Sequence, residues 1–327
     1  MTLPRRTFLR LAGATAAGLA APRIGWAQAY PTRAVRMIVP FLPGGPTDLF
    51  TRMIAPKLSE QMGQQFYVEN VGGAGGNIGA GRAALAAPDG YTLLIDGANF
   101  VVNPALYATV PYDPFKNFEA VTMSVTSAVV LTVHPSVPAK TVKDLIALIR
   151  AEPNKYSYAS PGTGTPPQLV GELFRITLGL KDLVHVPFKG GGEAIASALG
   201  GQTPVSFGAL APAVPLVKDG RLRALAVASK ARSSVLPDVP TMAEAGYPEV
   251  EGESWFAVVV PAGTPKEITD RLNREIAKAV AAPDVTQRLA VLGYAAVSSS
   301  PEDCAAKFKA EAAKWTKVIG ASGIKGE

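Results

Sequence analysis

Short runs of β-branched residues alternate with helix-like segments, and two long apolar runs divide this alternation into parts. One series of strand and helix patterns covers residues 35–96, and a second covers residues 141–229. The long strand-like runs lie at 121–135 and 254–261. Three helices are expected to close the chain, near residues 265–281, 284–292 and 301–322. Strands that alternate with helices are typical of α/β proteins with parallel sheets.

We interpret the two long runs as crossovers between two sheets. One lobe then combines residues 30–125 with residues 255–327, and the second lobe, residues 126–254, is inserted between them. Two crossovers make a natural hinge, and a cleft between lobes is a usual place for a small-molecule site. The expected fold class is therefore α/β, with two lobes that are each a mixed sheet flanked by helices.

Residues 1–29 have the pattern of an export signal. Paired arginines, Arg5 and Arg6, are followed by a small apolar run at residues 11–21 and by small residues at Ala27 and Ala29. This order of basic, apolar and small residues is typical of a cleaved signal, and the paired arginines favour the twin-arginine route. We expect cleavage near Ala27 or Ala29 and a periplasmic protein. The alternative is an amphipathic helix that is retained.

Composition excludes several function classes. Residues 1–29 hold four arginines and no acid, and the rest of the chain holds 28 basic and 26 acidic residues, so no basic surface for nucleic acid is expected. The single cysteine, Cys304, and two histidines, His134 and His185, make a metal centre improbable. No G-x-S-x-G elbow is present. We expect no metal centre and no serine nucleophile of this kind.

Two glycine-containing turns, each between a strand and a helix, are the best candidates for a binding site. They cover residues 40–48 and 160–168. Unpaired N–H groups at the start of a helix favour an anion. In the first turn, Thr47 or Asp48 is expected to cap the helix. In the second, hydroxyl groups and glycine amides can surround a carboxylate or its bridging waters. If the two turns face each other across a cleft, they can hold a small anion.

A third glycine-rich segment, residues 72–81, suggests another function. Gly73, Gly75 and Gly79 lie between a strand and a helix, and Asp96 ends the next strand, which is close to a dinucleotide-binding fingerprint. An exported compartment holds little of this cofactor, so we favour a glycine-rich turn that lines the cleft. An exported dinucleotide-dependent enzyme stays the alternative from a different class.

Motifs along nearly the whole mature chain resemble the substrate-binding proteins of tripartite tricarboxylate transporters, also called the Bug family. The resemblance rests on the order and spacing of motifs at residues 30–48, 68–80, 87–96, 103–107, 112–122, 133–148, 185–192, 219–229, 236–246 and 254–265. It implies a two-lobed periplasmic binding protein, similar to the type II class, that closes on a small carboxylate and delivers it to membrane permease subunits. It also implies no cofactor and no catalytic residues. We expect a monomer, and a ligand-sensing protein is a further alternative.

By the same resemblance, the ligand site combines the two turns with nearby walls. The residues expected to bind the ligand are Pro43, Gly44, Gly45, Asp48, Asn77, Asn99, Ser160, Gly162, Thr163, Gly164, Thr165, Phe207 and Gly208. The chain departs from the family at two positions. Gln168 stands where the family often has histidine, and Gly208 stands where it often has aspartate. Without that carboxylate to bind a ligand ammonium, we expect an acid that is not an amino acid.

Overall fold

The computed structural model describes residues 30–326, of which residues 33–326 form one compact unit. Its strands make one continuous sheet in the order β2-β1-β3-β9-β4-β7-β5-β6, with β8 and β10 also paired to β4. The strands are β1 (Val35–Val39), β2 (Phe66–Asn70), β3 (Thr92–Gly97), β4 (Phe118–Val133), β5 (Ser157–Ser160), β6 (Val184–Pro187), β7 (Val205–Ala209), β8 (Arg223–Val227), β9 (Glu253–Pro261) and β10 (Ala295–Ala296).

The sheet has two halves built on one plan. In the first half, β1 lies between two parallel neighbours, β2 and β3, and the antiparallel strand β9 joins β3 to β4. In the second half, β5 lies between two parallel neighbours, β6 and β7, and β7 pairs antiparallel with β4. Loops that leave the carboxyl ends of such parallel strands are where α/β proteins bind their ligands.

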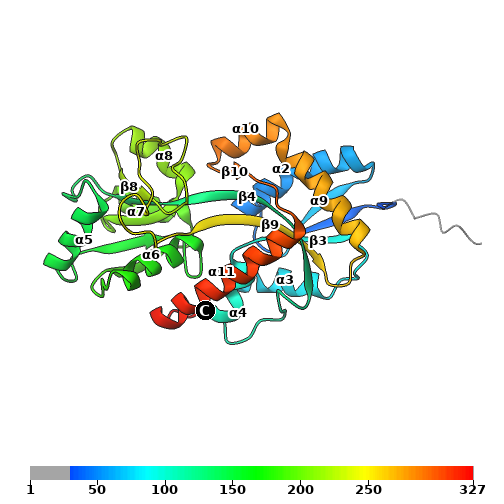
Figure 1. Cartoon of the computed structure of the whole chain (residues 1–327), viewed down its shortest axis with the longest axis horizontal. Helices are drawn as coiled ribbons and strands as arrows, with labels where there is room; N and C mark the ends of the chain where they lie inside the picture. The colour runs from blue at the N-terminus through cyan, green and yellow to red at the C-terminus, as the bar shows by residue number, and fades with distance from the viewer. Residues whose placement is uncertain (1–29, 327) are drawn as a thin grey trace, which may run out of the picture. The chain divides into compact units, whose positions relative to one another are not determined.

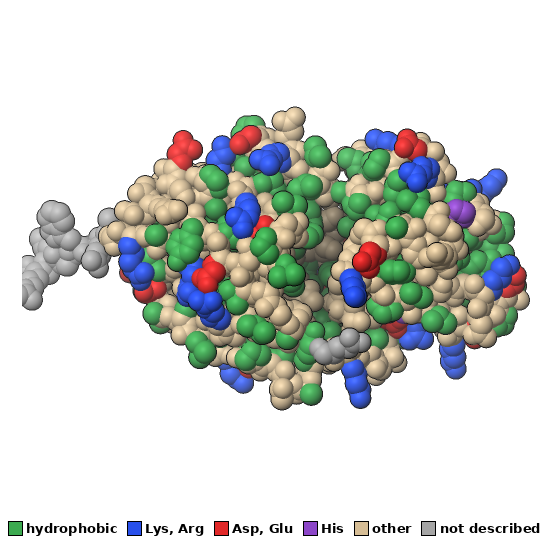
Figure 2. Space-filling view, turned by 180° about the vertical axis from the view of Figure 1, so that it is seen from behind, with side chains coloured by type: hydrophobic (Ala, Val, Ile, Leu, Met, Phe, Trp, Pro, Cys, Tyr) green, Lys and Arg blue, Asp and Glu red, His purple; other side chains and the backbone are tan. Residues whose placement is uncertain are grey.

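Strand β4 belongs to both halves. Residues 118–128 of β4 pair with β9, and residues 129–133 pair with β7 and β8. The molecule is correspondingly two-lobed: Figure 1 shows β4 and β9 running between two groups of helices, and Figure 2 shows the surface hollowed between the two lobes. The expected α/β, two-lobed architecture is confirmed.

The helices cover both faces of the sheet. They are α2 (Pro46–Met62), α3 (Asn77–Ala84), α4 (Asn99–Leu106), α5 (Val142–Ala151), α6 (Pro166–Thr177), α7 (Gly191–Leu199), α8 (Leu210–Lys218), α9 (Lys266–Ala281), α10 (Pro283–Val291) and α11 (Pro301–Ser322), with a short 3₁₀ helix at Ala74–Gly76. The three closing helices lie within two residues of their expected bounds. Helix α4 has no counterpart among the expected elements, because Val101, Val102 and Pro104 are poor helix formers.

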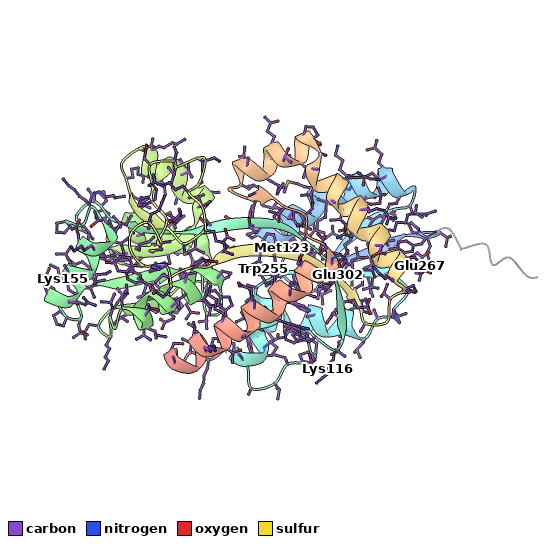
Figure 3. The ribbon with its side chains drawn as sticks, viewed as in Figure 1. Lys116, Met123, Lys155, Trp255, Glu267 and Glu302 are labelled. Carbon is purple, nitrogen blue, oxygen red and sulfur yellow. The ribbon has the colours of Figure 1, made fainter. Side chains whose placement is uncertain are left out.

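Helix α11 spans the two lobes, since it packs against α4 in the first and α6 in the second. Most of its buried residues recur every three or four positions, so they lie on one face of the helix, and this face includes the carboxylate of Glu311. The ring of Trp255 on β9 stacks on Phe308 with centroids 5.4 Å apart, and the Glu311 carboxylate accepts a 2.7 Å hydrogen bond from Trp315. Figure 3 shows Trp255 in the middle of the molecule, far from Lys155 and Glu267 near its two ends.

The starts of two helices differ in their caps. Thr141 caps α5, and Asp144 completes the capping box. The expected cap of α2 is wrong: the N-cap residue is Gly45, and Thr47 and Asp48 lie inside the helix. In the described part of the chain, no helix has the length and apolar character needed to cross a membrane. The predicted export signal, residues 1–29, lies outside the described residues.

Candidate functional site

The candidate site is built on two loops in equivalent places in the two halves. The first loop, residues 40–45, joins the end of β1 to α2, and the second loop, residues 161–165, joins the end of β5 to α6. Strands β1 and β5 are each the middle strand of a parallel set of three. Each helix begins with a proline, Pro46 or Pro166, whose fixed φ suits the first helical position and which has no N–H group.

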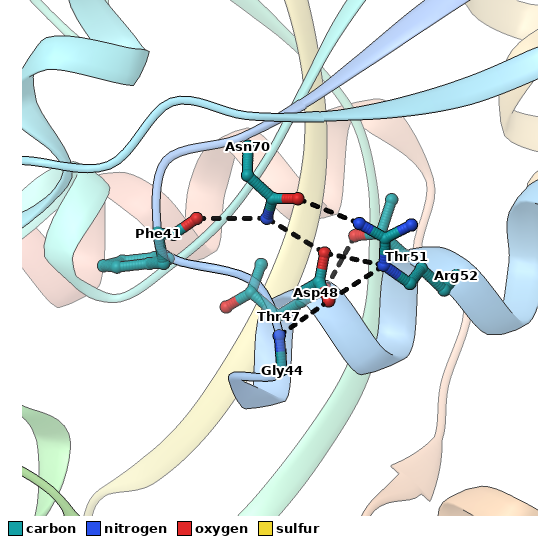
Figure 4. Close-up of polar contacts among 7 residues, drawn as sticks. All are labelled: Phe41, Gly44, Thr47, Asp48, Thr51, Arg52 and Asn70. Atoms are coloured by element: carbon teal, nitrogen blue, oxygen red, sulfur yellow. Dashed lines mark hydrogen bonds and ion pairs between the residues drawn. The ribbon is translucent and has the colours of Figure 1, made fainter.

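The first loop is held by the carboxylate of Asp48 (Figure 4). Gly44, at a φ of 85°, donates its N–H to Asp48 Oδ2 at 2.9 Å. Arg52 Nε donates to the same carboxylate at 2.9–3.0 Å, and Asn70 Nδ2 donates to it at 2.9 Å and to the Phe41 carbonyl at 3.1 Å. Asp48 is therefore bonded to its own loop, to the next helical turn and to β2.

The electrostatics of Asp48 agree with this geometry. Its side chain is only 2% exposed, and burial by itself raises the pKa of a carboxyl group. Hydrogen bonds from Arg52, Gly44 and Asn70 outweigh that effect and hold the pKa of Asp48 below its ordinary value. The carboxylate is thus ionised, and both of its oxygens accept hydrogen bonds from groups of the protein. The donors left for an anion are the N–H groups of Gly45, Thr47 and Asp48, for which no acceptor is found among residues 30–326.

The second loop has the same central hydrogen bond but a neutral acceptor. Gly164, at a φ of 76°, donates its N–H to Gln168 Oε1 at 2.6 Å. Thr165 Oγ1 donates to the Gly162 carbonyl at 2.7 Å, which closes the turn. Because Pro167 follows Pro166, the helix start has lost two N–H groups. Within the described residues, the N–H groups of Thr163 and Gln168 have no acceptor.

Behind the second loop, His185 on β6 makes two polar contacts. Its Nε2 lies 2.7 Å from Ser160 Oγ, and its Nδ1 lies 3.2 Å from Gln168 Nε2. Burial lowers the pKa of the imidazole to about 4, so the ring is neutral at pH 7. Ser160 is completely buried, and its hydroxyl is in contact with His185 and the Gly162 backbone.

The second loop also reaches the other lobe. A Cβ atom at Gly164 would lie 2.5 Å from Leu106 Cδ2 and 3.9 Å from Asn99 Nδ2, both on α4. Only glycine permits this close approach together with the positive φ. The structure therefore brings together Gly164 and Asn99, two residues that are expected from the sequence to share one site.

The other expected site residues lie in different surroundings. Pro43 and Thr163 are exposed on the two loops. Asn77 is buried, and its Oδ1 accepts a 2.8 Å hydrogen bond from Asn103 Nδ2. Phe207 is completely buried between the rings of Tyr158 and Phe174. Its neighbour Gly208 is half-buried, with only Ser206 Oγ within 4 Å of an added Cβ, at 3.8 Å.

The residues that support the loops are not among those expected from the sequence. Arg52 and Asn70 hold Asp48. The spacing of Asp48 and Arg52, four residues apart on a helix, is a signal that could have predicted their ion pair. Nothing in the sequence indicates that Asn70, or His185 behind the second loop, reaches these residues, because each comes from a neighbouring strand.

Comparison with known proteins points to one family. Residues 50–324 match the model of the tripartite tricarboxylate transporter family receptor. The chain is 36% identical over 311 residues to protein BugT of Bordetella pertussis, with 94% of each chain covered.

Two solved structures with named ligands have the same fold. Rpa4515 of R. palustris with adipate is 36% identical, with a TM-score of 0.78 and with 90% of this chain and 99% of that chain covered. MatC (Rpa3494) of Rhodopseudomonas palustris with bound malate is 32% identical, with a TM-score of 0.75 and with 89% of this chain and all of that chain covered.

Proposed function

Because the chain belongs to the tripartite tricarboxylate transporter receptor family, we propose that it is a periplasmic solute-binding protein that captures a small carboxylate and delivers it to membrane permease subunits. The observation that carries the proposal is the pair of loops with unpaired N–H groups. Each loop lies at the carboxyl end of a middle strand, and the two belong to different lobes. The similar proteins solved with adipate and malate support a carboxylate as the ligand.

The two loops contribute different groups to the proposed site. The N–H groups of Gly45, Thr47 and Asp48 form a helix start with its positive dipole end, which suits one carboxylate group. In the second lobe, Thr163 and the N–H group of Gln168 complete the site, together with Asn99 across from Gly164. Ordered water bridges the remaining distances at little cost. A site of this kind needs no cofactor and no reacting side chain.

Closure is proposed to occur at the shared strands. The lobe of residues 30–125 plus 255–327 turns relative to the lobe of residues 126–254, with β4 and β9 as the hinge. The partner change in β4 between Ala128 and Val129 supports this position, because pairing to β9 ends there and pairing to β7 begins. Hinge closure about a few residues at the ends of strands is a common mechanism of binding proteins.

The ligand is proposed to be a carboxylate other than an amino acid. The open space at Gly208 and the lack of a side-chain carboxylate there support this choice. The expected result of replacing Gly208 with Asp is weaker binding of adipate, while Gly208→Asn, of equal size and no charge, weakens it less. Tighter calorimetric binding of an amino acid than of every other acid tested with the unmodified protein contradicts this part of the proposal.

A thermal-shift screen of residues 30–327, stripped of ligand, tests the function itself. The panel holds di- and tricarboxylates (adipate and malate among them), aromatic acids, amino acids and nicotinamide dinucleotides. A ligand at 100 times its Kd stabilises the folded state by about 2.7 kcal/mol, which raises Tm by several degrees. A rise with one class of carboxylate is expected. A rise with a dinucleotide alone supports the exported enzyme instead.

Export by the twin-arginine route is proposed for residues 1–29, with cleavage near Ala27 or Ala29. Replacement of Arg5 and Arg6 by lysine is expected to stop processing. Normal accumulation of the processed protein in the periplasm would exclude this route.

A further inference from the structure

His185, which is half-buried, is the centre of a polar unit that supports the second loop from the neighbouring strand β6. Its ring packs on Tyr158, with centroids 4.8 Å apart, and bridges Ser160 at the end of β5 to Gln168 in the first turn of α6. Ser160 and Gln168 are both nine-tenths or more buried. The loop of residues 161–165 is therefore tied at both ends to the two nitrogens of one imidazole.

The hydrogen bonds allow only one protonation state of this unit. The Gly164 N–H can only donate, so the atom of Gln168 that it meets at 2.6 Å is the amide oxygen. The other end of that amide, Nε2, carries only donors, so the His185 Nδ1 that faces it must hold a lone pair. The ring proton is then on Nε2 and is donated to Ser160 Oγ. His185 is a neutral imidazole in one tautomer.

We infer that His185 is a positioning residue of the ligand site: in its neutral form it orients Gln168 and Ser160, and through them it holds the second loop in the shape that binds the carboxylate. This inference rests on the proposed function for its effect on affinity. In this inference the Gly164 N–H group supports the loop. It donates to Gln168 and is not a donor to the ligand.

Protonation of the ring would break this arrangement. A proton on Nδ1 would point at the NH₂ group of Gln168, so that two donors would face each other. If the amide rotated by 180°, its oxygen could accept from Nδ1, but its NH₂ group would then face the Gly164 N–H, which is also a donor. The charged and titratable groups around the ring are Glu172 and Arg175 on α6 and the Tyr158 hydroxyl on β5. Glu172 accepts from Tyr158 at 2.7 Å and from Arg175 at 2.7 Å, so its charge is already compensated. No free carboxylate among these groups is left to stabilise an imidazolium.

Three variants separate positioning from mere packing. His185→Phe removes both polar contacts and keeps a ring. His185→Asn keeps an acceptor near the Nδ1 position but cannot titrate. Gln168→Glu keeps an acceptor for Gly164 and replaces the NH₂ group with an oxygen that prefers a protonated His185, so the pKa of His185 should rise. Binding of adipate is measured by calorimetry from pH 8 to pH 4, and the titration of adipate is common to all proteins compared.

At pH 7, His185→Phe is expected to weaken adipate binding about tenfold, and His185→Asn at most about threefold. Relative to His185→Asn, the unmodified protein should lose affinity as the pH falls towards 4. Gln168→Glu should show the opposite slope and gain affinity as the pH falls from 8 to 6. Equal affinity of His185→Phe and the unmodified protein, or the same slope in both titrating proteins, would overturn the inference. If His185→Phe does not fold, the pH dependence of adipate affinity in the unmodified protein and in Gln168→Glu decides whether the inference holds.

A measurement without ligand keeps this test separate from the proposed function. The amide proton of Gly164, observed by NMR in the ligand-free protein, should move upfield in His185→Phe and stay in place in His185→Asn. If the unmodified protein binds neither adipate nor malate, the proposed function is wrong, and the Gly164 resonance still decides whether His185 positions the loop. An unchanged Gly164 resonance in His185→Phe shows that it does not.

Discussion

The two loops share a hydrogen-bond pattern but differ in charge. In each, a glycine with positive φ donates its N–H to the side chain four residues ahead, and a proline begins the helix. In the first loop the acceptor is the ionised Asp48, paired with Arg52. In the second it is the neutral Gln168, backed by the neutral His185. One function, to hold a glycine amide in place, is thus performed once with an ion pair and once without any charge.

This difference bears on how each loop treats an anion. A ligand carboxylate in the first loop would be repelled by the Asp48 carboxylate if Arg52 did not compensate its charge. Because the Arg52 side chain is half exposed, salt weakens the Arg52–Asp48 ion pair. The second loop has no charge to compensate, but its second proline leaves it fewer N–H donors. In the proposed site, the first loop therefore contributes more donors, and the second contributes an uncharged surface.

The largest effect is expected from Gly164→Ala. The added methyl group would lie 2.5 Å from Leu106 Cδ2, and alanine would have to adopt a φ of 76°, so either Leu106 or the second loop must shift. We expect adipate affinity to fall about 100-fold, since strain and overpacking each cost 1 kcal/mol or more. Gly44→Ala, at a φ of 85° with nothing within 4 Å, should lose less than about tenfold because only strain remains.

Gly179→Ala is the matched control for strain alone, because Gly179 has a φ of 62°, open surroundings and no place in either loop. Its Tm should fall, and its adipate affinity should not. Equal losses of affinity in Gly164→Ala and Gly44→Ala would mean that closure does not depend on the contact with α4.

The next effect tests the charged loop. Asp48→Ala removes the acceptor for Gly44 and leaves Arg52 unpaired, so adipate affinity should fall about tenfold while the protein still folds. Asp48→Asn keeps an oxygen for Gly44 and removes only the charge, and it should lose about threefold or less. If Asp48→Asn is as weak as Asp48→Ala, the charge of Asp48, and not its role as an acceptor, organises the first loop.

The sequence predicts the strands, loops and helices of the candidate site better than the hydrogen bonds and charges that distinguish the two loops. Both loops, their flanking strands and the helices that follow could be located from the β-branched runs and glycines, because those patterns are local. The expected cap of α2 is wrong, because Thr47 and Asp48 are good capping residues but the helix begins earlier, with Gly45 as its N-cap. The contacts that support each acceptor from a neighbouring strand, Asn70 to Asp48 and His185 to Gln168, join residues 22 and 17 positions apart, and no local pattern encodes them. The ion pair of Asp48 with Arg52, four residues ahead on one helix, is the exception.

The next largest effect is expected in the pH dependence of stability, because His185 and Asp48 contribute to the stability of their loops over different pH ranges. The pKa of His185 is about 4 in the folded protein, below the 6.5 of an unperturbed imidazole, so the unfolded chain binds the extra proton first. Stability contributed by the neutral ring is present above pH 6.5 and is lost as the pH falls from 6.5 to 4. The pKa of Asp48 is lowered, so its contribution is lost only below the ordinary carboxyl range.

Thermal denaturation between pH 7 and pH 4 therefore compares the two. We expect the unmodified protein to lose a few degrees of Tm over this range more than His185→Asn does, and Asp48→Asn to follow the unmodified protein. A parallel decline in all three would show that neither loop controls stability in mild acid.

The smallest effects should come from the two threonines of the second loop, and they separate support from contact. Thr165 Oγ1 donates to the Gly162 carbonyl at 2.7 Å, so Thr165→Val should lower both Tm and adipate affinity, the latter about threefold. Thr163 is exposed, and its hydroxyl has no hydrogen bond within residues 30–326, so Thr163→Val can weaken binding only by losing a contact with the ligand. We expect it to lower affinity about twofold with Tm unchanged. If Thr163→Val has no effect on affinity while Thr165→Val does, the second loop acts through its shape and backbone, as an uncharged surface fixed from behind should.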